Sequence, residues 1–395
     1  MSSYNAPIRD MQFVMRELAD LEAVAALPGC EDAAPDVVDA ILEEAGKFAG
    51  GVLAPLNWEG DKNPSSWKGG EVTATPGFKE AFKQFTEGGW QGLQHPVDFG
   101  GQGLPLAVHS AVNEIWSASN LAFGLCPLLT LSAIDALDAH GSKELKDIYL
   151  EKLISGEWTG TMCLTEPHCG TDLGLMRTKA EPQADGTYKL TGNKIFISAG
   201  EHDMADNIIH LVLARLPDAP PGIKGVSLFI VPIAVVGLER MPTGANPDMF
   251  VLTLPLAEGK GALVADPALA SLAERVEKAN GELKAATMWF MANGMTNPNN
   301  VGAGAHHYMH LMGIVALGLM WLKMGTAASA ALAAGSEDKA FHETKLTTAR
   351  YYGERFTPDA GALRRKIEAD PSRPQLIVTE RGAGYCFNVP VESLY

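Results

Sequence analysis

The feature that most constrains the fold of this chain is a change of pattern near Thr159. Before it, apolar residues recur at spacings of three and four. After it come short runs rich in β-branched and aromatic residues, separated by turn dipeptides. The first pattern is typical of amphipathic helices and the second of β-strands. Because 395 residues are enough for two or three domains, we expect a helical domain followed by a β-domain.

Helices are predicted over most of the N-terminal part. The apolar periodicity places three of them at residues 8–27, 34–48 and 76–85. A glycine-rich loop at residues 98–105 precedes the next helix, and Pro105 suits the first turn of that helix. Ser142 is a typical N-cap residue, so a further short helix is expected from there to Ile154.

Strands are predicted after Thr159. The dipeptides Asp185-Gly186 and Gly192-Asn193 are hairpin-type turns on either side of one strand. The β-rich runs lie at residues 187–190, 194–198, 208–214 and 226–231. Strands at this spacing without intervening helices predict an antiparallel β-domain.

The C-terminal part returns to helical periodicity. Helices are expected at residues 268–293, 302–334 and 338–355, and a small hairpin in the tail. The whole chain is therefore predicted as an α+β fold with these parts: a helical N-terminal domain (1–158), a β-domain (159–238), a linker or truncated region (239–267), a C-terminal helical domain (268–369) and a tail (370–395).

Charge and composition exclude several classes of function. A formal charge of −16 repels phosphate backbones, which disfavours nucleic-acid binding. Five scattered cysteines are too few for a disulfide framework. The N-terminus does not have the basic-then-apolar pattern of a signal peptide, and the most apolar stretch, residues 309–324, is short and interrupted. We therefore expect a cytoplasmic protein without a membrane span.

The segment of residues 162–172 lies where helix gives way to strand and combines hydroxyls, a glycine and a proline. Thr165 and Thr171 can donate to carbonyl or ring-nitrogen acceptors, and Gly170 lets the backbone approach a flat ligand closely. Composition alone favours a simpler interpretation, a solvated turn after a strand.

A family resemblance changes that weighting. Leu164-Thr-Glu-Pro-His-Cys-Gly-Thr-Asp172 resembles the acyl-CoA dehydrogenase signature, hydrophobic-Thr-Glu-Pro-x-x-Gly-Ser/Thr-Asp. Lys194-Ile-Phe-Ile-Ser-Ala199 resembles the second flavin-binding strand of that family, and the loop at residues 98–105 resembles its N-terminal glycine element. Two motifs in this order are far more specific than either motif alone.

The resemblance implies FAD as the cofactor. It assigns contact with FAD to these residues: Met162, Leu164, Thr165, Gly170, Thr171, Phe196 and Ser198. By resemblance, the Thr165 hydroxyl would lie near the reactive face of the flavin, and Phe196 would stack against the edge of its ring. Ser198 would form a hydrogen bond to the ring, and Thr171 would lie near the cofactor phosphates or the acyl-CoA.

The implied activity is oxidation of an acyl-CoA thioester to the 2,3-unsaturated acyl-CoA in fatty acid metabolism. A flavin accepts a hydride while a positioned carboxylate removes a proton. An electron-transfer flavoprotein or a similar acceptor, and assembly as a homo-oligomer, are expected from the same resemblance. The family's catalytic carboxylate usually stands in a Tyr-Glu-Gly-Thr context.

That context does not occur in this chain, so no catalytic residue is assigned. The resemblance covers roughly the first 235 residues and the helical stretch at residues 286–356, which is similar to a C-terminal extension in a long branch of the family. It skips the middle, as an internal deletion would. The alternative hypothesis is therefore a catalytically silent remnant or a scaffold protein. The sequence leaves open whether Glu239, Glu258 or another carboxylate substitutes as the base.

Other candidate sites carry weaker signals. Cys163, His168 and Cys169 do not have a usual zinc spacing, so no metal is expected there. His306 and His310 are one helical turn apart and could form a ligand pair, although a plain surface or core group is the simpler interpretation. About 25 residues of the tail are similar to winged-helix response regulators, too short a fragment for a DNA-binding domain.

Overall fold

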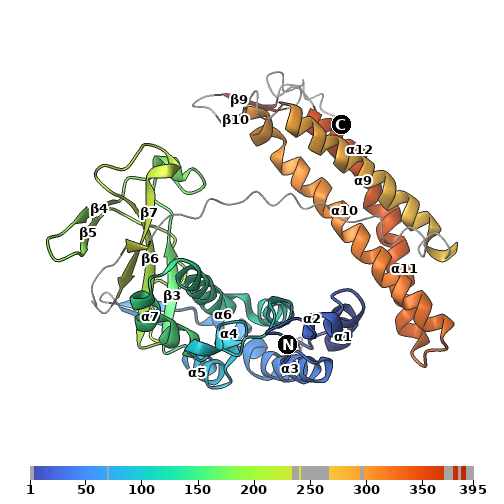
Figure 1. The fold of residues 1–395 in the computed structure, drawn as a ribbon, viewed down its shortest axis with the longest axis horizontal. Coiled ribbons are helices and arrows are strands. Elements are labelled where there is room, and N and C mark those ends of the chain that lie inside the picture. Colours follow the sequence, from blue (N-terminus) through green and yellow to red (C-terminus); the bar gives the residue numbers. More distant parts are fainter. Residues whose placement is uncertain are drawn as a thin grey trace. The chain divides into compact units, whose positions relative to one another are not determined.

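The computed structural model describes residues 4–68, 71–233, 240–241, 267–293, 298–368, 377–380 and 384–387. The chain divides into two compact units, residues 1–248 and 249–395 (Figure 1). The first unit contains the helical N-terminal part and the sheet, and the second contains the C-terminal helices.

Helices dominate the N-terminal part of the first unit, as predicted. They are α1 (Ile8–Glu17), α2 (Leu21–Ala25), α3 (Pro35–Phe48), α4 (Ala54–Lys62), α5 (Phe78–Glu87), α6 (Leu106–His140) and α7 (Lys143–Ser155). Short π- and 3-10-helical segments and a small hairpin, β1 (Ser66–Lys68) with β2 (Glu71–Thr73), connect them. The N-cap prediction is confirmed, because the Ser142 side chain accepts a hydrogen bond from the Leu145 amide at 3.3 Å.

One predicted helix is wrong in its extent. Residues 8–27 form α1 and α2 rather than a single helix, because Asp20 adopts a left-handed conformation with φ of 50°. Its carboxylate accepts a hydrogen bond from the Ala23 amide and so caps α2. An acidic residue that tolerates this conformation can start a new helix within a continuous apolar pattern.

Helix α6 is broken inside at Asn120, where φ is −157° and ψ is 87°. The buried Asn120 side chain replaces the lost helical bonds: its amide donates to the Leu53 carbonyl, and its oxygen accepts from the Phe123 amide. The aromatic core lies around this break: Phe123 makes edge-to-face contacts with Phe78 and Phe85, and Phe85 makes another with Trp116.

The glycine-rich loop before α6 is held by backbone hydrogen bonds. The Gly101 amide donates to the Pro96 carbonyl, and the Gly103 amide donates to the His95 carbonyl. A Cβ atom on Gly101 would lie 2.1 Å from the His95 carbonyl oxygen, whereas one on Gly100 would meet nothing within 4 Å. Close backbone packing therefore requires glycine at position 101.

Gly101→Ala is expected to lower the free energy of unfolding by about 3 kcal/mol or more, because two backbone segments must move apart. Gly100→Ala is the matched control. Gly100 has φ of +85° but open space around it, so its replacement should cost only about 1 kcal/mol. Urea unfolding of the two variants measures the difference, and equal losses would contradict the packing argument.

The sheet of the first unit follows α7. Its strands are β3 (Trp158–Cys163), β4 (Lys179–Pro182), β5 (Tyr188–Thr191), β6 (Asn207–Arg215), β7 (Val226–Pro232) and β8 (Arg240–Met241). The order is β5-β4-β6-β7-β8, and β3 also pairs with β6. One apolar core joins the sheet to α6 and α7 through Ile134, Leu137, Tyr149, Leu153, Ile209, Leu211 and Ile230.

The prediction of a purely antiparallel sheet is wrong. β3 pairs with β6 in parallel register from Trp158↔Asn207 to Cys163↔Val212, and β4 also meets β6 in parallel. The physical reason is the long connection at residues 164–206, which returns the chain to the same end of the sheet before β6 begins. A mixed sheet therefore carries the segment that starts at Leu164.

The strand predicted at residues 194–198 does not form either. After β5 the chain runs without regular structure through these residues, and Phe196 has φ of 58°. A positive φ is incompatible with a strand, so the β-branched and aromatic composition was misleading.

The second unit is a bundle of helices, as predicted. It contains α9 (Pro267–Asn293), α10 (Pro298–Ala333), α11 (Lys339–Arg355) and α12 (Ala360–Glu368). The predicted tail hairpin is confirmed as β9 (Ile377–Glu380) antiparallel to β10 (Gly384–Phe387). Most of the predicted linker, residues 239–267, lies outside the described residues.

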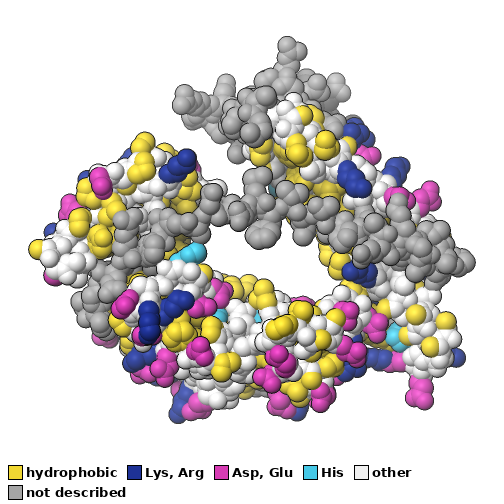
Figure 2. All heavy atoms as spheres, viewed as in Figure 1, with side chains coloured by type: hydrophobic (Ala, Val, Ile, Leu, Met, Phe, Trp, Pro, Cys, Tyr) yellow, Lys and Arg dark blue, Asp and Glu magenta, His cyan; other side chains and the backbone are white. Residues whose placement is uncertain are grey.

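Two helices of the described part of the chain are long and apolar enough to cross a membrane by length and composition alone. They are α6 and the stretch of α10 at residues 301–333. In the structure, 56% of the most apolar stretch of α6 and 44% of that of α10 are buried. Core helices of soluble proteins can be equally long and apolar. On the face drawn in Figure 2, acidic, basic and apolar side chains are interspersed.

Candidate functional site

The two motifs that the sequence pointed to lie side by side in the first unit. The Lys194 ammonium donates to the Leu164 carbonyl at 3.1 Å, and the Ile195 amide donates to the Thr165 carbonyl at 2.9 Å. Residues 164–166 leave the end of β3, which is fixed in the sheet by β6. The contacts with Lys194 and Ile195 therefore position residues 194–196 against a rigid strand end.

Glu166 lies buried where residues 164–166 cross residues 194–196, with only 3% of the residue exposed. One carboxylate oxygen accepts from the Thr178 hydroxyl at 2.6 Å, the Thr178 amide at 3.0 Å and the Lys194 ammonium at 2.9 Å. The other oxygen accepts from the Arg177 amide at 2.8 Å. Glu166 thus joins three segments that are separate in sequence.

The charge of Glu166 is strongly favoured. Burial alone would raise the pKa of its carboxyl group, but the hydrogen bonds from Thr178, Arg177 and Lys194 outweigh burial and lower that pKa to about 2. The carboxylate therefore stays ionised, and its partner Lys194, whose side chain is 11% exposed, supplies the compensating charge.

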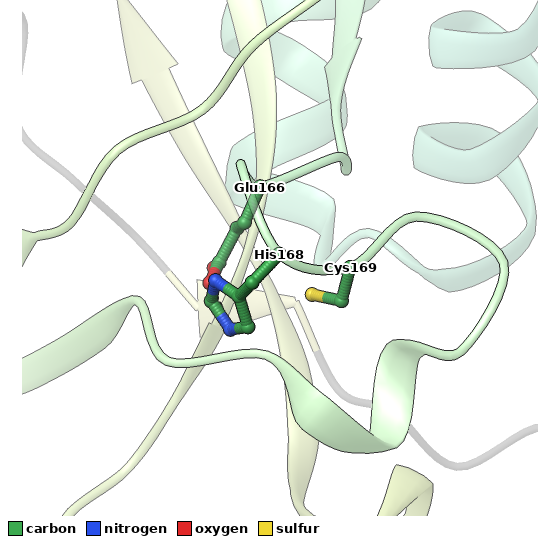
Figure 3. Close-up of side chains that lie close together, drawn as sticks. All are labelled: Glu166, His168 and Cys169. Atoms are coloured by element: carbon green, nitrogen blue, oxygen red, sulfur yellow. Dashed lines mark ion pairs between the residues drawn. The ribbon is translucent and has the colours of Figure 1, made fainter. Parts of the chain in front are cut away.

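Glu166, His168 and Cys169 lie close enough to resemble a metal site (Figure 3). Their ligand atoms are within 4.8 Å of one another. However, Glu166 already accepts four hydrogen bonds, and the neighbouring Lys194 ammonium would repel a cation. His168 Nε2 also contacts the Leu175 carbonyl at 3.0 Å. This cluster is best explained as a structural one, in which Glu166 holds neighbouring segments together by hydrogen bonds.

The sequence suggested a different set of three residues, Cys163, His168 and Cys169, but the group that lies close together contains Glu166 in place of Cys163. Cys163 lies at the end of β3 and contacts the Thr161 hydroxyl at 3.7 Å. Cys169 instead closes a tight turn, because its amide and carbonyl both bond to the backbone of Glu166. The turn presents His168 at the surface and leaves Cys169 buried.

Thr165 and Gly170 face each other across this turn. A Cβ atom on Gly170 would lie 3.3 Å from Thr165 Cγ2 and 3.7 Å from its hydroxyl oxygen. Thr165 is half-buried, and within the described part of the chain no hydrogen bond engages its hydroxyl group. This hydroxyl is therefore available to a ligand that approaches the strand end.

Phe196 is the most unusual residue of the site. The residue is 87% exposed, and its φ of 58° is costly for a non-glycine residue. The ring follows directly after Ile195, which bonds to Thr165. An exposed aromatic ring on a strained backbone is a feature that clusters at ligand sites.

The other predicted cofactor residues are placed less closely. Met162 is half-buried in β3 and packs against the core between the sheet and α7. Thr171 and Ser198 are exposed, and neither hydroxyl has a hydrogen bond to any of the residues that the structure describes. The structure thus brings Leu164, Thr165 and Gly170 together near Phe196 without adding direct partners for Thr171 or Ser198.

Sequence reasoning missed two supports of the site. Arg215, at the end of β6, donates to the carbonyls of Met176, Gly174, Pro220 and Gly222 and so orders the loop after residue 172. The arginine has no motif that would have revealed this role. Its five-donor guanidinium simply matches a cluster of carbonyls that only folding assembles.

His202 is the second missed support. Its Nδ1 accepts from the Met204 amide at 3.2 Å, so Nε2 carries the proton and donates to the Thr159 hydroxyl at 3.1 Å. Burial lowers the pKa of His202 to about 4, and burial raises the pKa of the adjacent Cys126 thiol to about 12. The neutral ring fixes the start of β3 against α6.

Comparison with known proteins agrees with this architecture. The profile described as "Acyl-CoA dehydrogenase, N-terminal domain" matches residues 38–157, and "Acyl-CoA dehydrogenase, middle domain" matches residues 161–248. "Acetyl-CoA dehydrogenase C-terminal like" matches residues 256–373. The chain belongs to the acyl-CoA dehydrogenase family.

Individual relatives agree with this assignment. The chain is 49% identical over 235 residues to 3-methylmercaptopropionyl-CoA dehydrogenase of Ruegeria pomeroyi, covering 60% of this chain and 40% of that protein. It is 38% identical over 235 residues to a butyryl-CoA dehydrogenase of Syntrophomonas wolfei, covering 58% and 38%. The matches thus span about two fifths of the length of these curated relatives.

Proposed function

We propose that this chain binds FAD and oxidises an acyl-CoA thioester to the 2,3-unsaturated acyl-CoA. The observation that carries the proposal is the crossing of residues 164–166 with residues 194–196. Within the described part of the chain, it leaves the Thr165 hydroxyl without a hydrogen bond and Phe196 exposed next to a fixed strand end. Membership of the acyl-CoA dehydrogenase family supports the choice of ligand.

The residues at the crossing suit a flat, polar-edged ring. Leu164 and Met162 offer apolar surface, the Thr165 hydroxyl can donate to a ring nitrogen or carbonyl, and the Phe196 ring can cover an edge. Gly170 leaves room for close backbone approach. FAD, when bound, supplies the acceptor for the hydride that leaves Cβ of the thioester.

The proton at Cα needs a separate base, and Glu166 cannot provide it. Its oxygens already accept four hydrogen bonds, and a pKa of about 2 makes it a very weak base. Glu239 and Glu258, the substitutes considered from the sequence, lie outside the described residues. The proposal therefore assigns cofactor binding to named residues and leaves the base unassigned.

The names of two relatives support a choice of substrate class. Their names specify a butyryl thioester and a 3-methylmercaptopropionyl thioester, both short acyl chains. We therefore propose a short acyl-CoA as substrate and an electron-transfer flavoprotein or similar acceptor as partner. A cytoplasmic location and a homo-oligomeric state are part of the same proposal.

The alternative is a silent or scaffolding protein that kept the flavin-binding face. The missing Tyr-Glu-Gly-Thr context motivates it. The match of the C-terminal family profile to residues 256–373 favours the enzyme instead. Turnover of an acyl-CoA with an artificial electron acceptor distinguishes the two, since a scaffold would show none.

Phe196→Ala tests the cofactor site directly. Loss of the stacking ring is expected to weaken FAD binding about tenfold, or ~1.4 kcal/mol. The free energy of unfolding without FAD should change by less than about 0.5 kcal/mol, because the ring is exposed. Fluorescence titration with FAD measures the affinity.

Trp67→Ala is the matched control for Phe196→Ala. Trp67 is also an exposed aromatic residue of the first unit, at 72%, but it lies in the β1–β2 hairpin. Its removal should leave FAD affinity unchanged. If Phe196→Ala bound FAD as tightly as the natural chain, the proposed stacking role would be wrong.

A further inference from the structure

Three histidines lie within one turn and a half of α10, and none is used by the proposed flavin site. The His306 and His310 rings are exposed, with centres 4.5 Å apart and planes inclined at 67°. The opposite face of this part of α10 is buried through Leu311 and Val315. The pair therefore lies on the solvent side of a helix that is fixed by its core.

Both rings are available for a ligand. Among the residues that the structure describes, no hydrogen bond or ion pair engages His306 or His310. The four-residue spacing puts the two side chains on the same helix face one above the other. Their backbone needs no movement to bring the rings together, because they are already in contact.

The distance between the rings matches that of a chelate. A metal bound at about 2.1 Å to each imidazole nitrogen lies about 3.2 Å from each ring centre. With an angle of about 90–110° between the two bonds, the centres are then about 4.5–5.3 Å apart. The observed 4.5 Å falls at the right-angle end of this interval.

We propose that His306 and His310 form a surface chelate for a divalent transition-metal ion, bound through one nitrogen of each ring. Water completes the coordination, since the site is exposed. Imidazole pairs suit Cu²⁺, Ni²⁺ and Zn²⁺, and the right-angle geometry is that of tetragonal Cu²⁺ or Ni²⁺. Cu²⁺ binds most tightly, and Mg²⁺ and Ca²⁺, which take oxygen ligands, do not bind.

His307 is adjacent but is not part of the pair. Its ring centre is 5.3 Å from that of His306, and the residue is half-buried. Consecutive residues of a helix project about 100° apart around its axis. Lys366 of α12 is a cationic neighbour of His307, which makes this third ring a poor additional ligand.

The test uses the full-length chain and Cu²⁺ alone, measured by calorimetric titration and by electron paramagnetic resonance. The natural chain should bind one Cu²⁺ that His306→Ala or His310→Ala weakens at least tenfold. The resonance spectrum should show two equivalent nitrogen ligands in the natural chain and one in either variant. His306→Gln, which keeps a helix-compatible polar side chain, should give the same loss.

Two controls separate the pair from general histidine binding. His140→Ala removes an exposed histidine at the end of α6 and should leave the affinity unchanged. His307→Ala should also retain tight binding. Equal Cu²⁺ affinity of the natural chain, His306→Ala and His310→Ala would overturn the proposal, as would loss of binding in His307→Ala with retention in His306→Ala.

Discussion

Replacement of Glu166 by alanine is expected to lower the free energy of unfolding by about 3–5 kcal/mol. The change leaves the Lys194 ammonium, only 11% exposed, without its charge partner. It also leaves the backbone amides of Arg177 and Thr178 without their acceptors. Because Glu166 joins residues 177–178 and 194 to the end of β3, FAD binding should be lost together with stability.

A double-mutant cycle with Lys194→Met isolates the pair. Urea unfolding of Glu166→Ala, Lys194→Met and the double variant should show that the double variant loses less than the sum of the singles. Lys143→Met, which breaks the exposed pair with Asp147, is the matched control and should cost less than about 0.5 kcal/mol. Strict additivity at Glu166 and Lys194 would contradict the coupling.

Stability is expected to fall steeply as the pH drops from about 6.5 to about 4. Burial is the main cause that lowers the pKa of His95 and of His202 to about 4. The folded pKa of each ring is thus below its unfolded value, so each stabilises the fold fully above about pH 6.5. That contribution is lost as the pH falls through 4, at most about 3 kcal/mol for each ring.

Charged and titratable groups near the two rings change their pKa values less than burial does. Near His95, the neighbouring His109 lowers its pKa further and Asp138 opposes the shift. For His202, Asp203 opposes the shift and His210 adds to it. The carboxylate of Glu166 contributes only at the acid end of this range, because its stabilisation begins to be lost below about pH 4.5.

Unfolding by urea at several pH values between 7.5 and 4 checks this prediction. His202→Gln cannot titrate, so its stability should decrease less steeply with acid than that of the natural chain. His140→Gln, an exposed position, should keep the full slope. A flat stability profile between pH 6.5 and 4.5 would show that the two buried rings do not act in this way.

The sequence predicted the fold where a single local pattern decides the outcome. The helices before Thr159, the bundle after residue 267 and the Ser142 cap all depend on periodicity or on one capping side chain. These predictions are confirmed, except that residues 8–27 form two helices instead of one. The break at Asn120 was not predicted, because it depends on a hydrogen bond to Leu53, which is distant in sequence.

The position of the candidate site could also be predicted only where local sequence motifs indicate it. Motif resemblance located residues 162–172 and 194–199, and folding places Leu164 and Thr165 next to Lys194 and Ile195. The strand assignment at residues 194–198 failed because a positive φ at Phe196 cannot be read from composition. The assignment of FAD contacts stays a prediction for all seven residues named from the resemblance, including those that folding brings together.

Anaerobic addition of acyl-CoA to the FAD-loaded chain tests the central claim most directly. We expect a short acyl-CoA to bleach the visible absorbance of the oxidised flavin and to yield the 2,3-unsaturated thioester, with an electron acceptor restoring the colour. A chain that binds one FAD but stays oxidised with every acyl-CoA would be a silent flavoprotein. A chain that binds no FAD after reconstitution would contradict the flavin site itself.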